Sequence, residues 1–302
     1  MRRGNMMQRL MVGGAAVAAL SLTMTACGSG SDEGSSGGGG GGEKKEITIG
    51  YIAWDEDIAV TNLWKKVLED KGYTVKTTQV DAAPLFAGMA KGDIDVFFDG
   101  WLPSTHATYW KRYGNKLEDL GVWYGPATLG LAVPNYVKAQ SIADLKTMGG
   151  QFDNKIIGIE PGAGEMSVVK DKVMPAYGLS NMKLVQSSTP AMLAQLKKSI
   201  SQKKPIVVTL WKPHWAYSKF PIRDLKDPKG AWGAADKIHT LANKDFSKNS
   251  PQAAGWFKKF KMTDKDLSKL EADVQAAGKG KEAEGVQTWM DANKDLVNSM
   301  TS

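Results

Sequence analysis

Apolar and polar residues alternate along the first part of the chain in a pattern that predicts strands and helices in a repeating order. Residues 46–54 alternate in the manner of a half-buried strand, and apolar residues spaced three and four apart then predict a helix over residues 58–68. A strand over residues 73–80, a helix that begins near Pro84 and a short buried strand over residues 94–98 follow. This β-α-β-α-β order predicts parallel strands joined by right-handed crossovers.

The same order of elements recurs further along the chain. We expect a strand over residues 155–160, a helix over 165–177, a strand over 182–188, a helix from Thr189 and a strand over 206–210. Two copies of one plan predict an α/β fold with two lobes, each a mainly parallel sheet flanked by helices. A ligand of such a fold is expected in the cleft between the lobes.

The segments outside the two copies set the predicted domain boundaries. The chain is expected to cross between the lobes near Val133-Pro134 and to return between Trp232 and Leu241, and the tail after Pro251 has the pattern of helices. The predicted division is residues 1–26 as a signal peptide, 27–45 as a lipidated cysteine with a flexible tether, 46–133 as the first part of lobe I, 134–235 as lobe II, and 236–302 as the return to lobe I with the C-terminal helices.

Three tryptophans lie where predicted strands give way to loops. Trp54 follows the first strand, and Trp101 and Trp211 each come two residues before a proline that stops a later strand. Ligands of open α/β sheets bind at this carboxyl edge. A contact between a cation and the face of an indole ring contributes roughly 0.5–2 kcal/mol to binding. A quaternary ammonium also has no N–H group that needs a hydrogen-bond partner. The three positions therefore predict an aromatic cage for a small quaternary ammonium ion.

Three such contacts fall short of the roughly 8 kcal/mol that micromolar binding requires, so a second contribution is needed. Glycines between a strand and a helix, within residues 161–165, allow backbone N–H groups to approach an anion at the helix N-terminus. This segment is too short for a dinucleotide fingerprint and lacks the Lys-Ser/Thr pair of a phosphate loop, so a carboxylate is the better-sized guest. His106 is a further candidate donor, and the expected ligand is a small zwitterion.

The N-terminus has the build of a secretory signal. Three arginines precede a short apolar run over residues 10–22, which is too short for a confident membrane span. The run leads to Cys27, the sole cysteine, which therefore forms no internal disulfide and stands where a bacterial lipoprotein is cleaved and acylated. Residues 28–42 are almost all Gly and Ser and predict a flexible tether that reaches roughly 20 Å. The Arg2-Arg3 pair leaves the export route open.

Charge and motif content argue against nucleic-acid binding and catalysis. The net charge is +7, but there is no run of five basic residues, so nucleic acid is not an expected partner. The chain lacks Gly-x-Ser-x-Gly, His-Glu-x-x-His and a free cysteine nucleophile. Asp93, Asp95 and Asp99 suggest acid/base work or metal binding, but acids of this kind commonly flank strands. We expect no enzyme, no cofactor and no metal.

Five segments resemble one protein family, with Asp-Gly-Trp-Leu-Pro and Trp-Lys-Pro-His-Trp as their most specific parts. They are residues 57–64, 91–106, 117–124, 161–164 and 205–215. These segments are similar to the glycine betaine-binding lipoproteins of ABC importers, and the resemblance extends from Ile47 to the C-terminus. It implies a two-lobed periplasmic-binding-protein fold, of type II, that closes on its ligand.

The resemblance also implies a biological setting. The protein would be an exported monomer, held at the outer face of the cell membrane through Cys27, that captures glycine betaine and related betaines for osmoprotection. Its partners would be the permease and ATPase subunits of an importer. By motif position, the resemblance assigns the cage to Trp54, Trp101 and Trp211, and it assigns the ligand carboxylate to His106 and to the backbone N–H groups of Gly164 and Glu165.

Some alternatives stay open at this point. Trp215 could replace Trp211 in the cage, and His214 is assigned to structure. The family pattern has an apolar residue in place of Glu165, so this acid must point away from the ligand carboxylate or tune selectivity. A choline or carnitine receptor of the same fold is the alternative function: choline lacks the carboxylate, and carnitine needs more room.

Overall fold

A computed structural model describes residues 43–302 of the chain. The predictions of a signal peptide, of lipidation at Cys27 and of a Gly/Ser tether fall on residues 1–42 and lie outside the described residues. The described part begins with β1 (Glu46–Tyr51), α1 (Asp55–Asp70), β2 (Thr74–Gln79), α2 (Ala82–Lys91), β3 (Val96–Leu102) and α3 (Ala107–Tyr113). This is the predicted β-α-β-α-β order.

The second copy of this order follows a long connecting strand. The elements are β4 (Leu117–Pro134), α4 (Leu145–Met148), β5 (Lys155–Ile157), α5 (Gly164–Val168), α6 (Met174–Tyr177), β6 (Lys183–Val185), α7 (Thr189–Ser201), β7 (Val208–Lys212), α8 (Ala216–Lys219) and β8 (Ile222–Asp224). The chain ends with β9 (Asp236–Asn243), α9 (Phe246–Asn249), α10 (Pro251–Lys259), α11 (Asp264–Ala277), α12 (Glu282–Ala292) and α13 (Lys294–Ser299). The predicted helix over residues 165–177 is interrupted between α5 and α6 by one π-helical turn just before Pro175, which has no N–H to donate.

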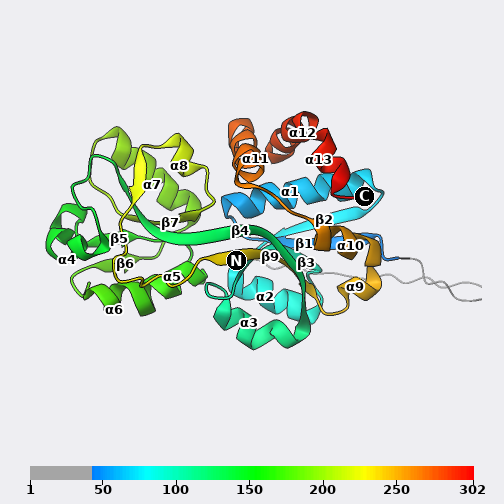
Figure 1. Cartoon of the computed structure of the whole chain (residues 1–302), viewed down its shortest axis with the longest axis horizontal. Helices are drawn as coiled ribbons and strands as arrows, with labels where there is room; N and C mark the ends of the chain where they lie inside the picture. Colours follow the sequence, from blue (N-terminus) through cyan, green and yellow to red (C-terminus); the bar gives the residue numbers. More distant parts are fainter. Residues whose placement is uncertain (1–42) are drawn as a thin grey trace, which may run out of the picture. The chain divides into compact units, whose positions relative to one another are not determined.

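The two copies build two lobes, and the predicted α/β architecture is confirmed (Figure 1). In the first lobe the strands run in the order β2-β1-β3-β9-β4, with β1 parallel to both β2 and β3. In the second lobe the order is β4-β7-β5-β6, with β5 parallel to β6 and β7, and β8 pairs with β4. The antiparallel strands β4 and β9 lie where the chain passes between the lobes.

Strand β4 belongs to both sheets and is drawn in Figure 1 as one long curved ribbon from lobe to lobe. Ala127 is the last residue of β4 that pairs with β9, and Thr128 is the first that pairs with β7. The strand therefore changes sheets earlier than the crossing near Val133-Pro134 that the proline suggested. The return passage enters β9 at Asp236, within the predicted interval.

The strands that carry two of the predicted cage residues are longer than their sequences indicate. Trp101 lies inside β3 and pairs with Ile238 of β9, and Trp211 lies inside β7 and pairs with Leu129 of β4. The prediction that these tryptophans stand in loops was wrong, because each strand gains an antiparallel partner from a distant part of the chain. Both strands still end just before the predicted prolines.

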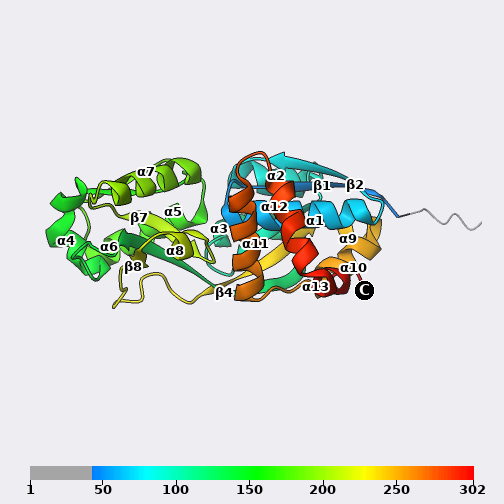
Figure 2. The same ribbon diagram turned by 90° about the horizontal axis from the view of Figure 1, so that it is seen from above.

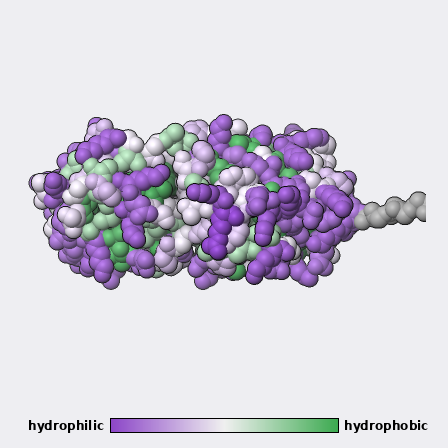
Figure 3. All heavy atoms as spheres, turned by 90° about the horizontal axis from the view of Figure 1, so that it is seen from below, coloured by the Kyte–Doolittle hydropathy of each residue, from purple (hydrophilic) through white to green (hydrophobic). Residues whose placement is uncertain are grey.

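Each lobe has its own buried apolar centre. The larger cluster surrounds the first sheet and continues into residues of the second lobe, and a smaller cluster lies within the second lobe. Helices α11 and α12 cover α1 on the first lobe (Figure 2). Hydrophilic residues cover most of the face in Figure 3, and Tyr136 is the large apolar residue most exposed among the described ones. Within residues 43–302, no helix has the length and apolar content that crossing a bilayer requires.

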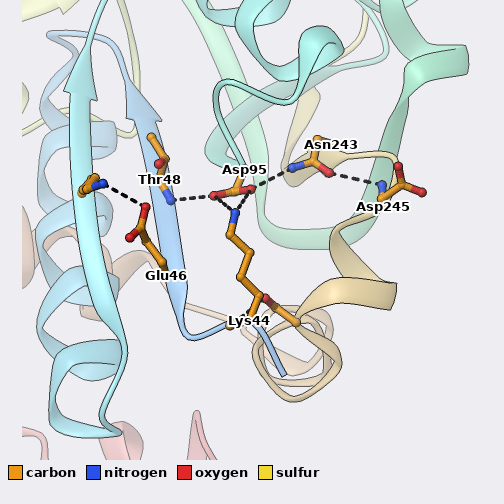
Figure 4. A network of polar contacts seen from close by, with 8 residues as sticks. Lys44, Glu46, Thr48, Asp95, Asn243 and Asp245 are labelled. Carbon is orange, nitrogen blue, oxygen red and sulfur yellow. Dashed lines mark hydrogen bonds and ion pairs between the residues drawn. The ribbon is translucent and has the colours of Figure 1, made fainter. Parts of the chain in front are cut away.

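The beginning of the described chain is fastened to the first lobe around Asp95 (Figure 4). The Asp95 carboxylate accepts hydrogen bonds from the backbone N–H of Thr48 at 2.8 Å and from the amide of Asn243 at 3.1 Å, and it pairs with Lys44 at 3.2 Å. One carboxylate thus joins the start of β1, the start of β3 and the end of β9. Asp95 has a structural role, and the backbone of Lys44 is also held, by Asn249 at 2.8 Å.

Candidate functional site

A cavity between the lobes brings all six predicted site residues together. The space between its lining atoms is about 260 Å³, with open solvent at its mouth included. The first lobe contributes Trp54, Glu56, Trp101, Thr105 and His106, the second lobe contributes Ile159, Ala163, Gly164, Glu165 and Trp211, and Leu129 comes from β4. Trp215 does not line this cavity. Of the two tryptophans that the sequence left open, Trp211 is therefore the one that lies at the cavity.

The three tryptophans are buried and are held in different ways. The rings of Trp54 and Trp211 lie 6.4 Å apart at an interplanar angle of 63°, so an edge of one ring meets the face of the other. The indole N–H of Trp54 donates to Glu160 of the second lobe at 3.4 Å. The indole N–H of Trp101 donates to Asp99 at 2.9 Å, which fixes the rotation of that ring in β3.

His106 presents an N–H donor that no protein group uses. Its Nδ1 accepts a hydrogen bond from the backbone N–H of Trp101 at 3.0 Å, so Nε2 carries the proton of the neutral ring. That Nε2 is buried and has no hydrogen-bond partner. Burial lowers the pKa of His106 to about 4, so the ring is neutral at physiological pH. The ring also stacks on Trp54, with centroids 5.7 Å apart.

The Gly-rich loop approaches the first lobe so closely that only glycine fits at its end. Gly164 begins α5, and a Cβ there would lie 2.1 Å from the carbonyl oxygen of Thr105. As the first residues of a helix, Gly164 and Glu165 have backbone N–H groups without intrahelical acceptors. Thr105 itself is fixed, because the Asp236 carboxylate accepts from its backbone N–H at 2.8 Å. The loop and His106 thus place three N–H donors around one side of the cavity.

The Glu165 side chain differs from what an anion site would contain. It is buried, and neither of its carboxyl oxygens has a hydrogen-bond partner. Burial raises the pKa of this carboxyl group well above its ordinary value, and the neighbouring Asp224 raises it further. Both effects favour the uncharged form of the acid, which resembles the apolar residue of the family pattern more closely than a carboxylate does. The backbone of Glu165 remains available at the cavity.

Sequence reasoning did not predict that a group of acids would be buried together beside the tryptophans. Glu56 lines the cavity, and Asp57, Asp99 and Glu271 lie around it. The sequence indicated acids at the start of α1, but nothing in it showed that α11 would cover them. Burial, with repulsion from Asp99, raises the pKa of both Glu56 and Asp57 well above their ordinary values. Burial raises the pKa of Asp99 to about 7.

We expect these acids to make the protein less stable as the pH rises. Burial, with repulsion from Asp55, raises the pKa of Glu271 to about 8, so the folded state keeps a proton that the unfolded state loses near pH 4.5. Stability is then lost progressively between pH 5 and 8. In urea, the free energy of unfolding of Glu271→Gln should exceed that of the parent protein by a few kcal/mol at about pH 8.5. At pH 5 the two free energies should be closer.

The matched control for this prediction is Glu284→Gln on α12, whose side chain is 67% exposed. It should leave the dependence of stability on pH unchanged. A Glu271→Gln variant whose stability follows the parent at every pH would mean that Glu271 is ionised in the folded protein.

The other residues that the sequence analysis considered do not line the cavity. His214 and Trp215 follow β7 and contact Asp55 at the start of α1, outside the cavity. Asp99 holds the ring of Trp101, and Asp95 has the structural role described above. Within residues 43–302 there is no group of three His, Cys, Asp or Glu side chains that could hold a metal ion.

Two α/β lobes around a closed, aromatic-lined cavity define a substrate-binding protein of the periplasmic-binding-protein type. A family profile described as the substrate binding domain of ABC-type glycine betaine transport systems matches residues 45–292. The chain belongs to this family, as the five sequence segments predicted. Because the family consists of transport proteins that bind a substrate, the chain is not an enzyme.

Individual relatives agree with the family. The chain is 36% identical over 158 residues to the glycine betaine/carnitine transport binding protein GbuC of Listeria monocytogenes, a match that spans 52% of each protein. It is 26% identical over 278 residues to the glycine betaine/proline betaine-binding periplasmic protein of Salmonella typhimurium, covering 79% of this chain and 84% of that one. The crystal structure of lactococcal OpuAC, closed on glycine betaine, has a TM-score of 0.80 and 34% identity, with 85% of this chain and all of that chain covered.

Proposed function

We propose that this protein captures glycine betaine outside the cytoplasm for import by an ABC transporter. The observation that carries the proposal is the meeting, in one cavity, of three tryptophans with the unpartnered Nε2 donor of His106 and the backbone N–H groups at the start of α5. The aromatic side suits a trimethylammonium group, and the donor side suits a carboxylate. Glycine betaine has these two groups one methylene apart.

The cation end of the ligand would lie among Trp54, Trp101 and Trp211. Each indole face offers roughly 0.5–2 kcal/mol to a desolvated cation. The buried acids behind the rings, Glu56 and Asp99, would add to this attraction in proportion to their ionisation. A quaternary ammonium also leaves no N–H group unsatisfied in a cavity with three tryptophans in its walls.

The carboxylate end would accept hydrogen bonds from the backbone N–H groups of Gly164 and Glu165 and from Nε2 of His106. Hydrogen bonds to an ionised group are worth about 1.5–3 kcal/mol each, and in this cavity they would otherwise remain unmade. Together with the cage, they bring the total to about 6–15 kcal/mol, a range that includes the roughly 8 kcal/mol of micromolar binding. The donors come from both lobes, so the ligand binds the closed state better than the open one and shifts the protein toward closure.

Related ligands are the alternatives. The name of the Listeria relative includes carnitine, and that of the Salmonella relative includes proline betaine. Choline would use the cage but leave the donors of His106 and the Gly-rich loop unpaired. We therefore place choline below the betaines.

The setting proposed for this capture is the outer face of the cell membrane. Lipidation of Cys27 would anchor the protein there as a monomer, and residues 28–42 would act as the tether. The closed form would deliver its ligand to a permease driven by an ATPase, and accumulation of the ligand would protect the cell against osmotic stress. Mass spectrometry of the membrane-extracted protein would detect the acylated cysteine.

The experiment that tests the ligand is a calorimetric titration of the purified protein with glycine betaine and then with choline. We expect tight one-to-one binding of betaine and much weaker binding of choline. Equal or better binding of choline would leave the cage standing and would remove the carboxylate assignment. Absence of heat with either ligand, at any concentration up to millimolar, would contradict the proposed function.

A change at His106 is expected to weaken the binding of betaine much more than that of choline. The change His106→Phe keeps a flat ring beside Trp54 and removes the Nε2 donor, so betaine affinity should fall about 10- to 100-fold. Choline has no carboxylate, and its affinity should change by less than about threefold. Titration calorimetry with both ligands checks this. A similar loss for both would indicate that the ring acts by packing alone.

A further inference from the structure

Asp55, at the start of α1, joins the two lobes outside the ligand cavity. Its carboxylate accepts a hydrogen bond from the indole N–H of Trp215 at 2.6 Å, and the Nε2 atom of His214 lies 3.2 Å from its other oxygen. Both partners belong to the second lobe, in the segment between β7 and α8. Gln275 of α11, in the first lobe, donates to the same carboxylate at 2.5 Å. Asp55 is 7% exposed, so these contacts are shielded from water.

Trp215 donates to this carboxylate, and the Nε2 atom of His214 lies close to it without making a hydrogen bond. The Nδ1 atom of His214 accepts a hydrogen bond from the backbone N–H of Ala216 at 3.0 Å, so the neutral ring carries its proton on Nε2. An indole nitrogen donates and never accepts. The arrangement therefore pairs a carboxylate of one lobe with the indole N–H group of Trp215 in the other, and the imidazole of His214 lies beside the pair. It makes no use of the ligand.

The same contacts are connected to the cage through the backbone. Asp55 stands between Trp54 and Glu56, which both line the ligand cavity, and Trp215 follows Trp211 by four residues. Asp55 and Trp215 themselves line a separate outer groove between the lobes, together with Pro190 and Gln275. Closure that brings Trp54 to Trp211 must also bring Asp55 to Trp215.

We propose that Asp55 is a positioning residue that latches the closed state by binding Trp215 and His214. This proposal rests on the proposed function, because the latch would stabilise the form that is closed around a zwitterion. It acts on the equilibrium between open and closed forms and does not touch the ligand. A contact that exists only in the closed form favours that form by its own interaction energy, and the apparent ligand affinity rises by the same factor.

The decisive variant is Trp215→Phe, which keeps an aromatic ring in place and removes the donor to Asp55. Stopped-flow measurements should show betaine dissociating about 10- to 100-fold faster, because an interaction with a charged group is lost only from the closed form. Asp55→Asn keeps an acceptor but removes the charge, and it should give a smaller increase. In the double variant the two effects should not add, because both changes remove one interaction.

The matched control is Tyr217→Phe, in the neighbouring helix α8. The Tyr217 hydroxyl donates to Asp224, and both residues belong to the second lobe. Removing this hydroxyl therefore loses a hydrogen bond to an aspartate without changing any contact between the lobes. Its betaine dissociation rate should stay at the parental value, and urea unfolding should show that all variants are folded.

A second readout keeps the latch testable whatever the ligand proves to be. Single-molecule fluorescence transfer between one dye on each lobe reports how long the closed form lasts. We expect the closed form of Trp215→Phe to last about 10- to 100-fold less long than that of the parent or of Tyr217→Phe. Equal closed lifetimes in the parent and Trp215→Phe would overturn the latch. Failure of the parent to bind betaine, with this difference in lifetime present, would overturn the ligand assignment alone.

Discussion

Replacing Gly164 with alanine is expected to reduce betaine affinity more than a hundredfold while leaving each lobe folded. The added Cβ would lie 2.1 Å from the carbonyl oxygen and 2.7 Å from the Cγ2 atom of Thr105, far inside van der Waals contact. Thr105 cannot move aside, because Asp236 binds the backbone N–H groups of both Ser104 and Thr105, at 2.7 Å and 2.8 Å. The clash lies between the lobes, so it opposes closure and not folding.

Calorimetry and small-angle scattering would check this prediction together. The Gly164→Ala variant should keep the scattering profile of an open form when betaine is added, and its unfolding midpoint should stay near that of the parent. Gly162→Ala provides a graded comparison in the same loop. The nearest atom to its added Cβ is the Tyr109 hydroxyl at 3.6 Å, an ordinary contact, so its affinity should fall far less. Equal effects of the two changes would contradict the steric argument.

The change Trp101→Ala is expected to weaken betaine binding by roughly two orders of magnitude. It removes an indole face worth roughly 0.5–2 kcal/mol to a cation, and it admits water to a wall that is 3% exposed. It also leaves the buried Asp99 without its partner, since the Trp101 indole donates to that carboxylate. Trp110→Ala on α3 is the control, because Trp110 packs against the first lobe without lining the cavity.

A ligand whose bulky end carries no charge separates cation attraction from shape in the same experiment. In 3,3-dimethylbutyrate a tert-butyl group replaces the trimethylammonium group of betaine, and the carboxylate is retained. The parent protein should bind it far more weakly than betaine, and Trp101→Ala should narrow that difference. If the parent bound both ligands equally well, the tryptophans would serve as an apolar wall and the cation would be incidental.

The order of the elements could be predicted from the sequence, because each β-α-β-α-β copy is built from contacts close along the chain. The periodicity of residues 58–68 is enough to indicate α1, and a left-handed Gly92 ends α2 where the sequence suggests. The ends of β3 and β7 could not be predicted in this way. The strand partner of Trp101 is Ile238, which is more than a hundred residues away, and no local pattern reports such a pairing.

The residues of the candidate site also fall into those that local sequence reveals and those that only tertiary structure reveals. Motif residues such as Trp54 and His106 could be found from the sequence because the surrounding segments carry a recognisable pattern. Thr105 could not be predicted as a site residue, because its importance comes from a backbone oxygen that meets Gly164 only when the lobes are assembled. The burial of Glu271 could not be predicted either, since it depends on how α11 packs over α1. Residue type and spacing indicate chemistry, but a close approach between distant segments depends on tertiary structure.

The two copies of the β-α-β-α-β unit place equivalent loops on opposite sides of one cavity. In each copy the third strand carries a tryptophan of the proposed cage at corresponding positions, Trp101 in β3 and Trp211 in β7. The loops after the first strands differ: one carries Trp54, and the other carries the glycines that end at Gly164. A nearly symmetric scaffold thus acquires its polarity from a single pair of unequal loops. Under the proposed function, that inequality would set the direction in which a zwitterion lies across the molecule, and exchanging the character of the two loops would be the way to reverse it.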